Sequence, residues 1–271
     1  MRGRVLIVAG SDSGGGAGIQ ADVKTVSMLD AYAATAITAL TAQNTEGVFG
    51  VLPVAPEFVR RQIEVVLDDI GADAIKTGML HDAAVIEVVA AALQQRAAAI
   101  PLVVDPVMAA KGGARLIDPA AVEALKRLLI TRAEIVTPNL PEAAILCGRR
   151  VSSVAEMRAS GQALLEFGCR AVLMKGGHLA GSTVTDILVS GAGVRIWENQ
   201  RIETRHTHGT GCTLASAIAA GLAQGQDLES AVDRARTYVQ HAIAGAPGLG
   251  RGHGPLDHAH PLRPHRSQAS S

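Results

Sequence analysis

The sequence predicts an α/β sandwich in which a mostly parallel sheet carries helices on both faces. Short runs of Val, Ile and Leu alternate with longer amphipathic or alanine-rich stretches along the 271 residues. This alternation is typical of parallel strands that are joined by crossover helices. Hydrophobic residues make up 48% of the chain, which is enough for a large core. We therefore expect a single α/β domain over residues 1–258.

The strands of the sheet are expected at apolar runs, most of which end at Gly, Pro or a polar residue: Arg4–Ala9, Ala34–Ala42, Ala74–Thr77, Leu102–Val104, Glu134–Val136 and Ala171–Met174. The helices between them are expected at Gly16–Asp30, Pro56–Asp69, Ala83–Arg96, Pro119–Leu129 and Val154–Phe167. A hairpin follows, with strands Thr183–Val189 and Val194–Arg201 on either side of Ser190-Gly191-Ala192-Gly193. Two further helices are expected at Cys212–Gln224 and Leu228–Gly245.

The segment after Gly245 is rich in Gly, Pro and His, and residues 259–271 are expected to form a flexible tail. It contains His253, His258, His260 and His265. Because metal ligands need fixed geometry, we interpret these histidines as part of a mobile surface segment rather than a metal site.

Composition argues against several kinds of partner. Lys and Arg together number 25, as do Asp and Glu, and aromatic residues make up 2% of the chain, so nucleic acid is not an expected partner. The apolar run Val5–Ala9 is too short for a signal-peptide core, and no uncharged apolar run approaches about 18 residues. We expect no membrane association and a cytoplasmic location. Three widely spaced cysteines suit neither a disulfide framework nor a zinc site.

The first glycine-rich turn, Gly10 to Gly18, follows a strand and opens a helix. Within it, Gly16-x-Gly18-x-x-Ala21 fits the loose dinucleotide fingerprint, which makes a dinucleotide oxidoreductase one alternative. The second predicted strand, however, ends at Gln43-Asn44-Thr45 rather than at an acidic residue that could hold a ribose. The fingerprint is therefore the weaker interpretation of this turn.

The second glycine-rich turn, Thr207 to Thr213, leads directly into an apolar helix. Gly209 and Gly211 leave the N–H groups of the turn open at the positive end of that helix, which favours binding of a phosphate and of charge that develops during its transfer. An ordinary helix start would need only Thr210 as a cap. No Walker motif occurs, so phosphoryl transfer would have to use this turn.

Seven segments together resemble one enzyme family. These are the first glycine turn, Thr38 to Thr45, Lys76-Thr77-Gly78-Met79, Val104-Asp105-Pro106-Val107, Thr137-Pro138-Asn139-x-x-Glu142, Lys175-Gly176-Gly177-His178 and Gly209-Thr210-Gly211-Cys212. In this order, from about Val5 to His258, the chain is similar to the hydroxymethylpyrimidine/phosphomethylpyrimidine kinases of thiamine biosynthesis, in the ribokinase superfamily. The resemblance implies a ribokinase-like three-layer sandwich and homodimeric assembly. It also implies ATP-dependent phosphorylation of 4-amino-5-hydroxymethyl-2-methylpyrimidine and then of its monophosphate.

The resemblance also places a catalytic base at Cys212, where sugar kinases of the superfamily usually carry Asp. The dipole at a helix start lowers a thiol pKa, so we expect Cys212 to be partly thiolate. The alternative is a buried helix cysteine. Most of the rate should come from positioning and from the anion hole of Gly209 and Gly211, because phosphoryl transfer is largely dissociative.

Lys175 follows a strand and precedes two glycines, so it can reach phosphate oxygens; a solvated lysine is the alternative. Asp105 and Glu142 are the candidate ligands for Mg²⁺, which takes one or two carboxylates and keeps several waters. Asp105 could instead only shape a turn, and Asn139 could only cap the helix that carries Glu142. The expected nucleotide contacts are Asn139, Lys175 and Thr210.

On the substrate side, the carboxamide of Gln43 can pair with an exocyclic amine and the adjacent ring nitrogen of an aminopyrimidine. The resemblance adds Gly10, Asp22, Met79 and Val107 to the ring pocket, although Met79 and Val107 could be ordinary core residues.

Two alternative functions remain from the sequence. A pyridoxal kinase shares the fold and the glycine turn, and Gln43 alone does not exclude it. A non-catalytic ligand sensor could keep the pocket, although the presence of Lys175, Gly209, Gly211 and Cys212 argues against it. The chain also departs from its relatives at Arg205-His206, where they tend to carry Lys-Asn, and at Gly112-Gly113, where a serine is common.

Overall fold

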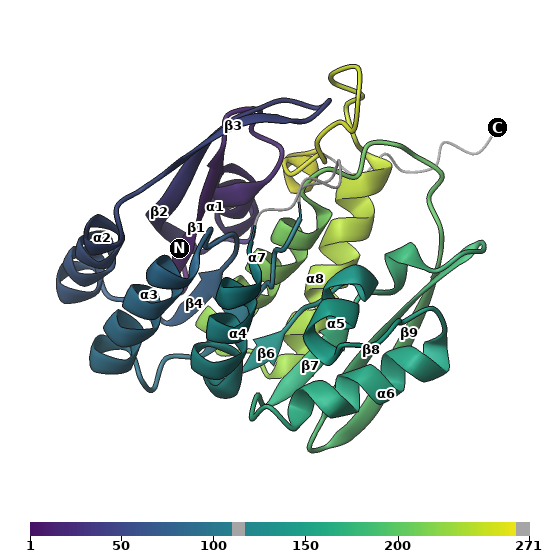
Figure 1. The fold of residues 1–271 in the computed structure, drawn as a ribbon. Coiled ribbons are helices and arrows are strands. Elements are labelled where there is room, and N and C mark those ends of the chain that lie inside the picture. Colours follow the sequence, from purple (N-terminus) through teal and green to yellow (C-terminus); the bar gives the residue numbers. More distant parts are fainter. Residues whose placement is uncertain (110–116, 264–271) are drawn as a thin grey trace.

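The computed structural model describes residues 1–109 and 117–263, and Gly112-Gly113 and His265 lie outside these ranges. A single sheet separates two layers of helices (Figure 1). Its strand order is β3-β2-β1-β4-β5-β6-β7-β8-β9. The strands are β1 Arg4–Asp12, β2 Tyr32–Gln43, β3 Val48–Pro53, β4 Ala74–Thr77, β5 Leu102–Val104, β6 Ile135–Val136, β7 Ala171–Met174, β8 Thr183–Ser190 and β9 Gly193–Gln200.

The centre of the sheet is parallel and its edges are antiparallel. The pairs β2–β1, β1–β4, β4–β5, β5–β6 and β6–β7 are all parallel. β3 pairs antiparallel with β2 at one edge, and the hairpin β8–β9 pairs antiparallel with β7 at the other. The central strands therefore end at one edge of the sheet, where ligands bind in open α/β folds.

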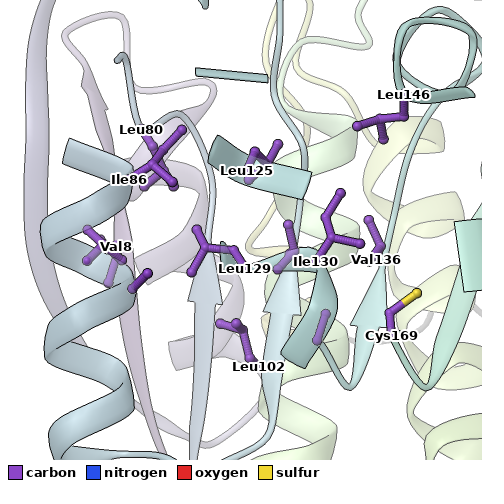
Figure 2. Close-up of a cluster of buried hydrophobic side chains, with 14 of the residues drawn as sticks. Val8, Leu80, Ile86, Leu102, Leu125, Leu129, Ile130, Val136, Leu146 and Cys169 are labelled. Atoms are coloured by element: carbon purple, nitrogen blue, oxygen red, sulfur yellow. The ribbon is translucent and has the colours of Figure 1, made fainter. Parts of the chain in front are cut away.

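In the described part of the chain, five α-helices cover one face of the sheet and three cover the other, and Figure 1 shows the two layers. The first layer contains α2 Pro56–Asp69, α3 Ala83–Arg96, α4 Pro119–Leu128, α5 Leu140–Cys147 and α6 Val154–Leu165. The second contains α1 Gly18–Met28, α7 Thr210–Ala223 and α8 Leu228–Ala244. Each layer packs its own apolar cluster against the sheet; Figure 2 shows part of the first, in which Val8, Leu102 and Val136 of the strands meet Ile86 and Leu125 of the helices.

The predicted α/β sandwich is confirmed, and most predicted elements agree with the structure within two or three residues. The sequence interpretation missed β3, because its apolar side chains point outward: Phe49 is 72% and Leu52 is 65% exposed. A strand without a buried face has no alternating pattern that would reveal it. The turn between β2 and β3 is closed by Asn44, whose side chain accepts from Glu46 N and Gly47 N.

The expectation of a flexible tail beginning at residue 259 is wrong for residues 259–263. A 3-10 turn, His260–Leu262, packs on α8, and His260 Nε2 lies 3.1 Å from Tyr238 O. Just before it, His258 is 5% exposed and its Nε2 lies 2.9 Å from Thr213 Oγ1 in α7. A hydrogen-bonded, buried side chain fixes its backbone, so this histidine does not belong to a mobile surface segment.

Among residues 1–109 and 117–263, no helix combines the length and apolar character that crossing a membrane would require. All three cysteines are free thiols, as expected from their number and spacing.

Candidate active site

The candidate residues gather at the carboxyl ends of the parallel strands, next to the start of α7. Gln43 is the last residue of β2, and Asp105 and Lys175 directly follow β5 and β7. Helix α7 is placed against these strands by a nearly continuous buried surface, because Thr213 to Gly221 are all buried. The first turn of α7 therefore faces the ends of the central strands.

Gly209 joins the two glycine-rich turns. It is the N-cap of α7 with φ of 85°, a left-handed conformation that glycine adopts without cost. A Cβ at this position would lie 1.9 Å from Gly16 O, so no other residue fits without moving the first turn. Thr210 does not cap the helix; its Oγ1 donates to Thr207 O at 2.8 Å. Thr210 N donates to Thr207 O, and Thr213 N closes the first turn on Gly209 O. The N–H groups of Gly211 and Cys212 lie between them, where a helix start offers no intrahelical acceptor and favours an anion.

Lys175 lies directly under this helix start. A Cβ added to Gly211 would be 3.1 Å from Lys175 Nζ and 3.6 Å from Asp105 Oδ2. Lys175 Nζ donates to Asp105 Oδ1 at 3.1 Å and lies 4.0 Å from Glu142 Oε2. Its side chain is 14% exposed, so the solvated-lysine alternative does not apply. Burial opposes the charge of Lys175, but the two carboxylates raise its pKa, and the ammonium stays positive beside the helix start.

Asn139 and Glu142 form a capping box at the start of α5. Asn139 Oδ1 accepts from Glu142 N at 2.9 Å, and Glu142 Oε2 accepts from Asn139 N at 2.8 Å. Asn139 is thus the N-cap of α5, one of the two roles that the sequence left open, and its Oδ1 is already hydrogen-bonded to Glu142 N. Burial raises the pKa of Glu142 to about 7; Asp105 adds to the rise and Lys175 opposes it.

The carboxylates of Asp105 and Glu142 fit a Mg²⁺ ion that is also held by phosphates. Within the described residues, no three His, Cys, Asp or Glu side chains form a ready ligand set. Mg²⁺ in phosphotransfer sites does not need one, because it takes one or two carboxylates and completes its shell with phosphate oxygens and water. Both carboxylates are buried and both lie near Lys175 Nζ, so an ion there would face the same phosphates as the lysine.

The expected thiolate at Cys212 is wrong. Burial raises the pKa of the Cys212 thiol to about 12. Lys76 and the backbone N–H of Gly18 act in the opposite direction, but Asp22 and Asp105 add to the rise. The helix dipole supplies at most a few kcal/mol and its effect is confined to the first turn. The thiol is therefore neutral near pH 7.

A buried ion pair underlies the turn. Lys76 Nζ donates to Asp22 Oδ2 at 2.8 Å, and both side chains are completely buried. Ser216 Oγ of α7 donates to Asp22 Oδ1 at 2.7 Å. Burial alone would lower the pKa of Lys76, but the carboxylates of Asp22 and the nearby Asp105 raise it. Both carboxylate oxygens of Asp22 are thus engaged inside the protein, and this residue links α1, β4 and α7 beneath the site instead of lining its surface.

Gly10, Met79 and Val107 lie at neighbouring strand ends. A Cβ on Gly10 would be 2.4 Å from Met79 Cε, so the absence of a side chain at Gly10 makes room for Met79. Thr38 Oγ1 donates to Met79 O at 2.6 Å and fixes the backbone there. Val107 is half-buried two residues beyond Asp105, and its N–H donates to Asp105 O. The structure therefore brings Gly10 and Met79 together, with Val107 on an adjacent strand end.

Gln43 contacts His208, which in turn contacts Asp12, and the sequence interpretation gave neither of these two residues a role. Its carboxamide lies 3.3 Å from His208 Nε2, and His208 Nε2 lies 2.8 Å from Asp12 Oδ2. Asp12 and His208 come from the two glycine-rich turns, so this contact ties the turns together at the end of β2. Both residues lie within the glycine-rich turns of the sequence, where a polar residue resembles ordinary turn chemistry.

The sequence interpretation also gave Lys76 no role of its own. A lysine within a four-residue buried strand needs a charged partner, and its position in the sequence therefore indicates a buried ion pair. The sequence does not say that the partner is Asp22, 54 residues earlier.

Comparisons with known proteins show the family to which the chain belongs. The family model described as phosphomethylpyrimidine kinase matches residues 12–257. A hydroxymethylpyrimidine/phosphomethylpyrimidine kinase of Streptomyces coelicolor is 49% identical over 254 residues, which cover 94% of this chain and 93% of the relative. The thiamine biosynthesis bifunctional protein ThiED of Geobacter sulfurreducens is 52% identical over 257 residues, or 95% of this chain. The chain spans only about half, 52%, of that bifunctional relative.

Solved structures give the same fold with two different substrates in their names. Phosphomethylpyrimidine kinase from Clostridium difficile superposes with a TM-score of 0.79 at 42% identity, covering 89% of this chain and 99% of that one. An ADP complex of Bacillus subtilis pyridoxal kinase superposes with a TM-score of 0.89 at 34% identity, covering 96% and 98%. The backbone alone therefore does not distinguish a pyrimidine substrate from pyridoxal.

Proposed function

The chain belongs to the phosphomethylpyrimidine kinase family and is a small-molecule kinase that uses ATP, and from this premise we propose that it phosphorylates 4-amino-5-hydroxymethyl-2-methylpyrimidine and then its monophosphate. The observation that carries the proposal is the convergence of Gly211, Lys175 and Asp105 at the open start of α7, with the Cys212 thiol on the same turn. This convergence supports phosphoryl transfer, because N–H groups at a helix start favour an anion, the lysine is a cation and a carboxylate is a ligand that Mg²⁺ prefers.

The geometry supports a transfer that depends mainly on charge stabilisation. The substrate hydroxyl oxygen attacks the γ-phosphorus, and the bond from that phosphorus to the β–γ bridging oxygen breaks to release ADP. N–H groups at the start of α7 and the Lys175 ammonium stabilise the charge on the transferred group. Because the transition state is loose, the hydroxyl proton leaves late, and we assign it to an oxygen of the transferred phosphoryl group.

Cys212 is assigned a role in orienting the hydroxyl. A thiol with a pKa of about 12 is a poor base at pH 7, because almost none of it is ionised. A neutral thiol can still donate and accept a weak hydrogen bond with the substrate hydroxyl. Its position on the turn, three residues after the N-cap Gly209, puts it beside the groups that hold the phosphate.

Asp105 and Glu142 would hold Mg²⁺ together with the ATP phosphates. The ion, when bound, neutralises charge on the β- and γ-phosphates. Glu142 is kept in place by its capping box with Asn139, and Asp105 by Thr137 Oγ1, which donates to Asp105 Oδ1 at 3.2 Å.

The substrate assignment rests on relatives and on Gln43. The most similar curated relatives with full-length coverage carry pyrimidine kinase names at 44–49% identity, whereas the pyridoxal kinase structures are 34% identical. Gln43 is the last residue of β2 and is held beside the first glycine-rich turn by Ser13, whose Oγ donates to Gln43 O at 2.9 Å; its carboxamide can pair with an aminopyrimidine. Pyridoxal kinase remains the second candidate because of its closer structural superposition, with a TM-score of 0.89 against 0.79.

The deciding experiment compares kcat/KM for the aminopyrimidine and for pyridoxal, measured as ADP release by the purified chain with ATP and Mg²⁺. We expect a clear preference for the aminopyrimidine. A preference for pyridoxal would assign the chain to the second function. No ADP release with either substrate would support a ligand sensor. Mass spectrometry of the products then shows whether the monophosphate is converted to the diphosphate.

We also propose a homodimer in the cytoplasm. β3 is an edge strand whose Phe49 and Leu52 are exposed, and α2 adds Phe58 at 59% exposure. An exposed edge strand with apolar side chains favours pairing with another chain. Three free thiols suit a reducing compartment. Light scattering after size exclusion would test the dimer, and Phe49→Lys should shift the mass to that of a monomer.

A further inference from the structure

We propose that His208 is a specificity-determining residue. Asp12 holds the His208 ring, and the Nε2–H of the ring fixes the orientation of the Gln43 carboxamide. In this orientation the carboxamide keeps one donor and one acceptor for the substrate. The proposal deepens the proposed function and rests on it for the identity of the substrate. The evidence is a count of hydrogen-bond donors and acceptors around three side chains.

The Asp12 carboxylate acts only as an acceptor. Its Oδ1 accepts from Gly14 N at 2.8 Å. Its Oδ2 accepts from Ala17 N at 2.8 Å and from Gly16 N at 3.1 Å. Asp12 is 3% exposed; burial opposes ionisation, but His208 and these N–H groups lower its pKa below the ordinary value. A carboxylate with this environment stays ionised.

His208 must therefore donate through Nε2. This atom lies 2.8 Å from Asp12 Oδ2, and an ionised carboxylate has no hydrogen to offer. The Nε2 atom carries a hydrogen in either protonation state that makes this contact. The backbone holds the ring in place as well, because His208 N donates to Gly254 O at 3.1 Å and a Cβ on Gly16 would touch the ring.

The same Nε2 lies 3.3 Å from one end of the Gln43 carboxamide. The structure places the Gln43 Nε2 end against His208 Nε2, and two N–H donors do not hydrogen-bond to each other. This end of the carboxamide must therefore be the carbonyl oxygen Oε1, so that Oε1 and Nε2 exchange places. They have nearly the same shape, and only their partners distinguish them. The Nε2–H of His208 is then shared between Asp12 Oδ2 and the Gln43 oxygen.

The contact at the other end of the carboxamide agrees with this orientation. That end lies 3.2 Å from Thr41 Oγ1, and Thr41 Oγ1 lies 3.0 Å from Ser11 O. The single hydroxyl hydrogen of Thr41 can satisfy Ser11 O only if Thr41 accepts from Gln43. With the NH₂ group at this end, all of these contacts pair a donor with an acceptor.

The fixed carboxamide has one lone pair and one N–H left. These match the exocyclic amine and the adjacent ring nitrogen of a 4-aminopyrimidine. A substrate without the amine leaves the remaining acceptor unpaired, and an unpaired buried polar group weakens binding by about 10- to 100-fold. If the orientation were free, Gln43 could turn to suit other ring edges, and this discrimination would be lost.

The first test is nitrogen-detected NMR of ¹⁵N-histidine-labelled protein without ligand. The His208 signals are identified by their loss in His208→Gln. We expect hydrogen on Nε2. A neutral ring with hydrogen only on Nδ1 would overturn the proposal, and this result does not depend on the substrate.

The second test measures kcat and KM for the aminopyrimidine and for 5-hydroxymethyl-2-methylpyrimidine, which lacks the amine. His208→Phe keeps the ring volume but has no donor, whereas His208→Gln returns an N–H. We expect His208→Phe to raise KM for the aminopyrimidine about 10-fold and to reduce the preference for it to within about 3-fold, with kcat much less affected. His208→Gln should restore the preference.

The matched control is His253→Phe, because His253 is exposed and its side chain hydrogen-bonds to backbone, with Nδ1 3.0 Å from Arg205 O. It should leave the preference unchanged. An equal loss for both pyrimidines in His208→Phe would indicate a merely structural role and overturn the proposal. If the wild-type protein phosphorylates neither pyrimidine, the proposed function fails, and the NMR test still decides the hydrogen-bond network.

Discussion

The substitution Gly211→Ala should separate catalysis from stability. Gly211 is the second residue of α7, and its φ is not in the left-handed region, so alanine fits its backbone. Alanine is favoured over glycine in helices by up to about 1 kcal/mol, and less in the first turn. The added Cβ would lie 3.1 Å from Lys175 Nζ, which is closer than a methyl group normally comes to a charged nitrogen.

The methyl group should therefore displace Lys175 and occupy the space of a phosphate oxygen. Loss of one group that stabilises developing charge costs about 10²- to 10³-fold in kcat, or roughly 3–4 kcal/mol in the barrier. We expect kcat for ADP release to fall by about this factor, while the melting temperature stays the same or rises by a few degrees. The assays are coupled ADP release and differential scanning fluorimetry on the same preparation.

Gly221→Ala in the same helix is the matched control. Its Cβ would lie 2.7 Å from Ala231 Cβ in α8 and 2.7 Å from Gln226 Oε1, far from the site. Overpacking of this kind costs about 1–3 kcal/mol, so the melting temperature should fall while kcat is retained. If Gly211→Ala kept kcat within about threefold of wild type, the open start of α7 would not be the phosphate site.

Three further predictions test the charges around the turn. Cys212→Ala should lower kcat about 10²-fold, whereas kcat of Cys212→Ser should stay within about tenfold of wild type, because a neutral hydrogen-bonding group suffices. If steady-state kinetics showed an equal loss of kcat in the two variants, Cys212 would act as a thiolate base. The kcat/KM for ATP with Mg²⁺ should rise with pH around a midpoint of about 7. The reason is the raised pKa of Glu142, which leaves its carboxyl group protonated below that value. Glu142→Gln should abolish this pH dependence. Lys76→Met should lower the free energy of unfolding by about 3–5 kcal/mol in urea titrations, because it leaves Asp22 buried and without its cation. The double variant Lys76→Met with Asp22→Leu should recover much of this loss.

The fold could be predicted because its signals are local. Buried strands such as Ala171–Met174 and helices such as Ala83–Arg96 contain the apolar residues that define them, and their bounds agree with the structure. The edge strand β3 could not be predicted in this way, because its pattern faces solvent and its existence depends on pairing with β2.

The site was predictable in its motifs but not in its contacts. Lys175, Asp105 and Gly211 were expected near phosphates, and the structure brings them together from β7, β5 and α7. The pairing of Lys76 with Asp22 and of His208 with Asp12 joins residues that are 54 and 196 positions apart. No spacing in the sequence reports such pairs. Cys212 shows the same limit, because its pKa depends on burial and on charges from other elements, which outweigh the local helix dipole.

The charges around Cys212 give a physical reason for a thiol at the end of the glycine turn. Asp22 and Asp105 already place two carboxylates near this position, opposed by Lys76 and Lys175. An aspartate there would add a third negative charge next to the incoming phosphates and would require a further cation to offset it. A neutral thiol adds none, so Lys175 remains available to the transferred phosphoryl group. The absence of charge at Cys212 therefore strengthens the anion hole, and the buried pair Lys76–Asp22 holds α7 in place without competing for the substrate.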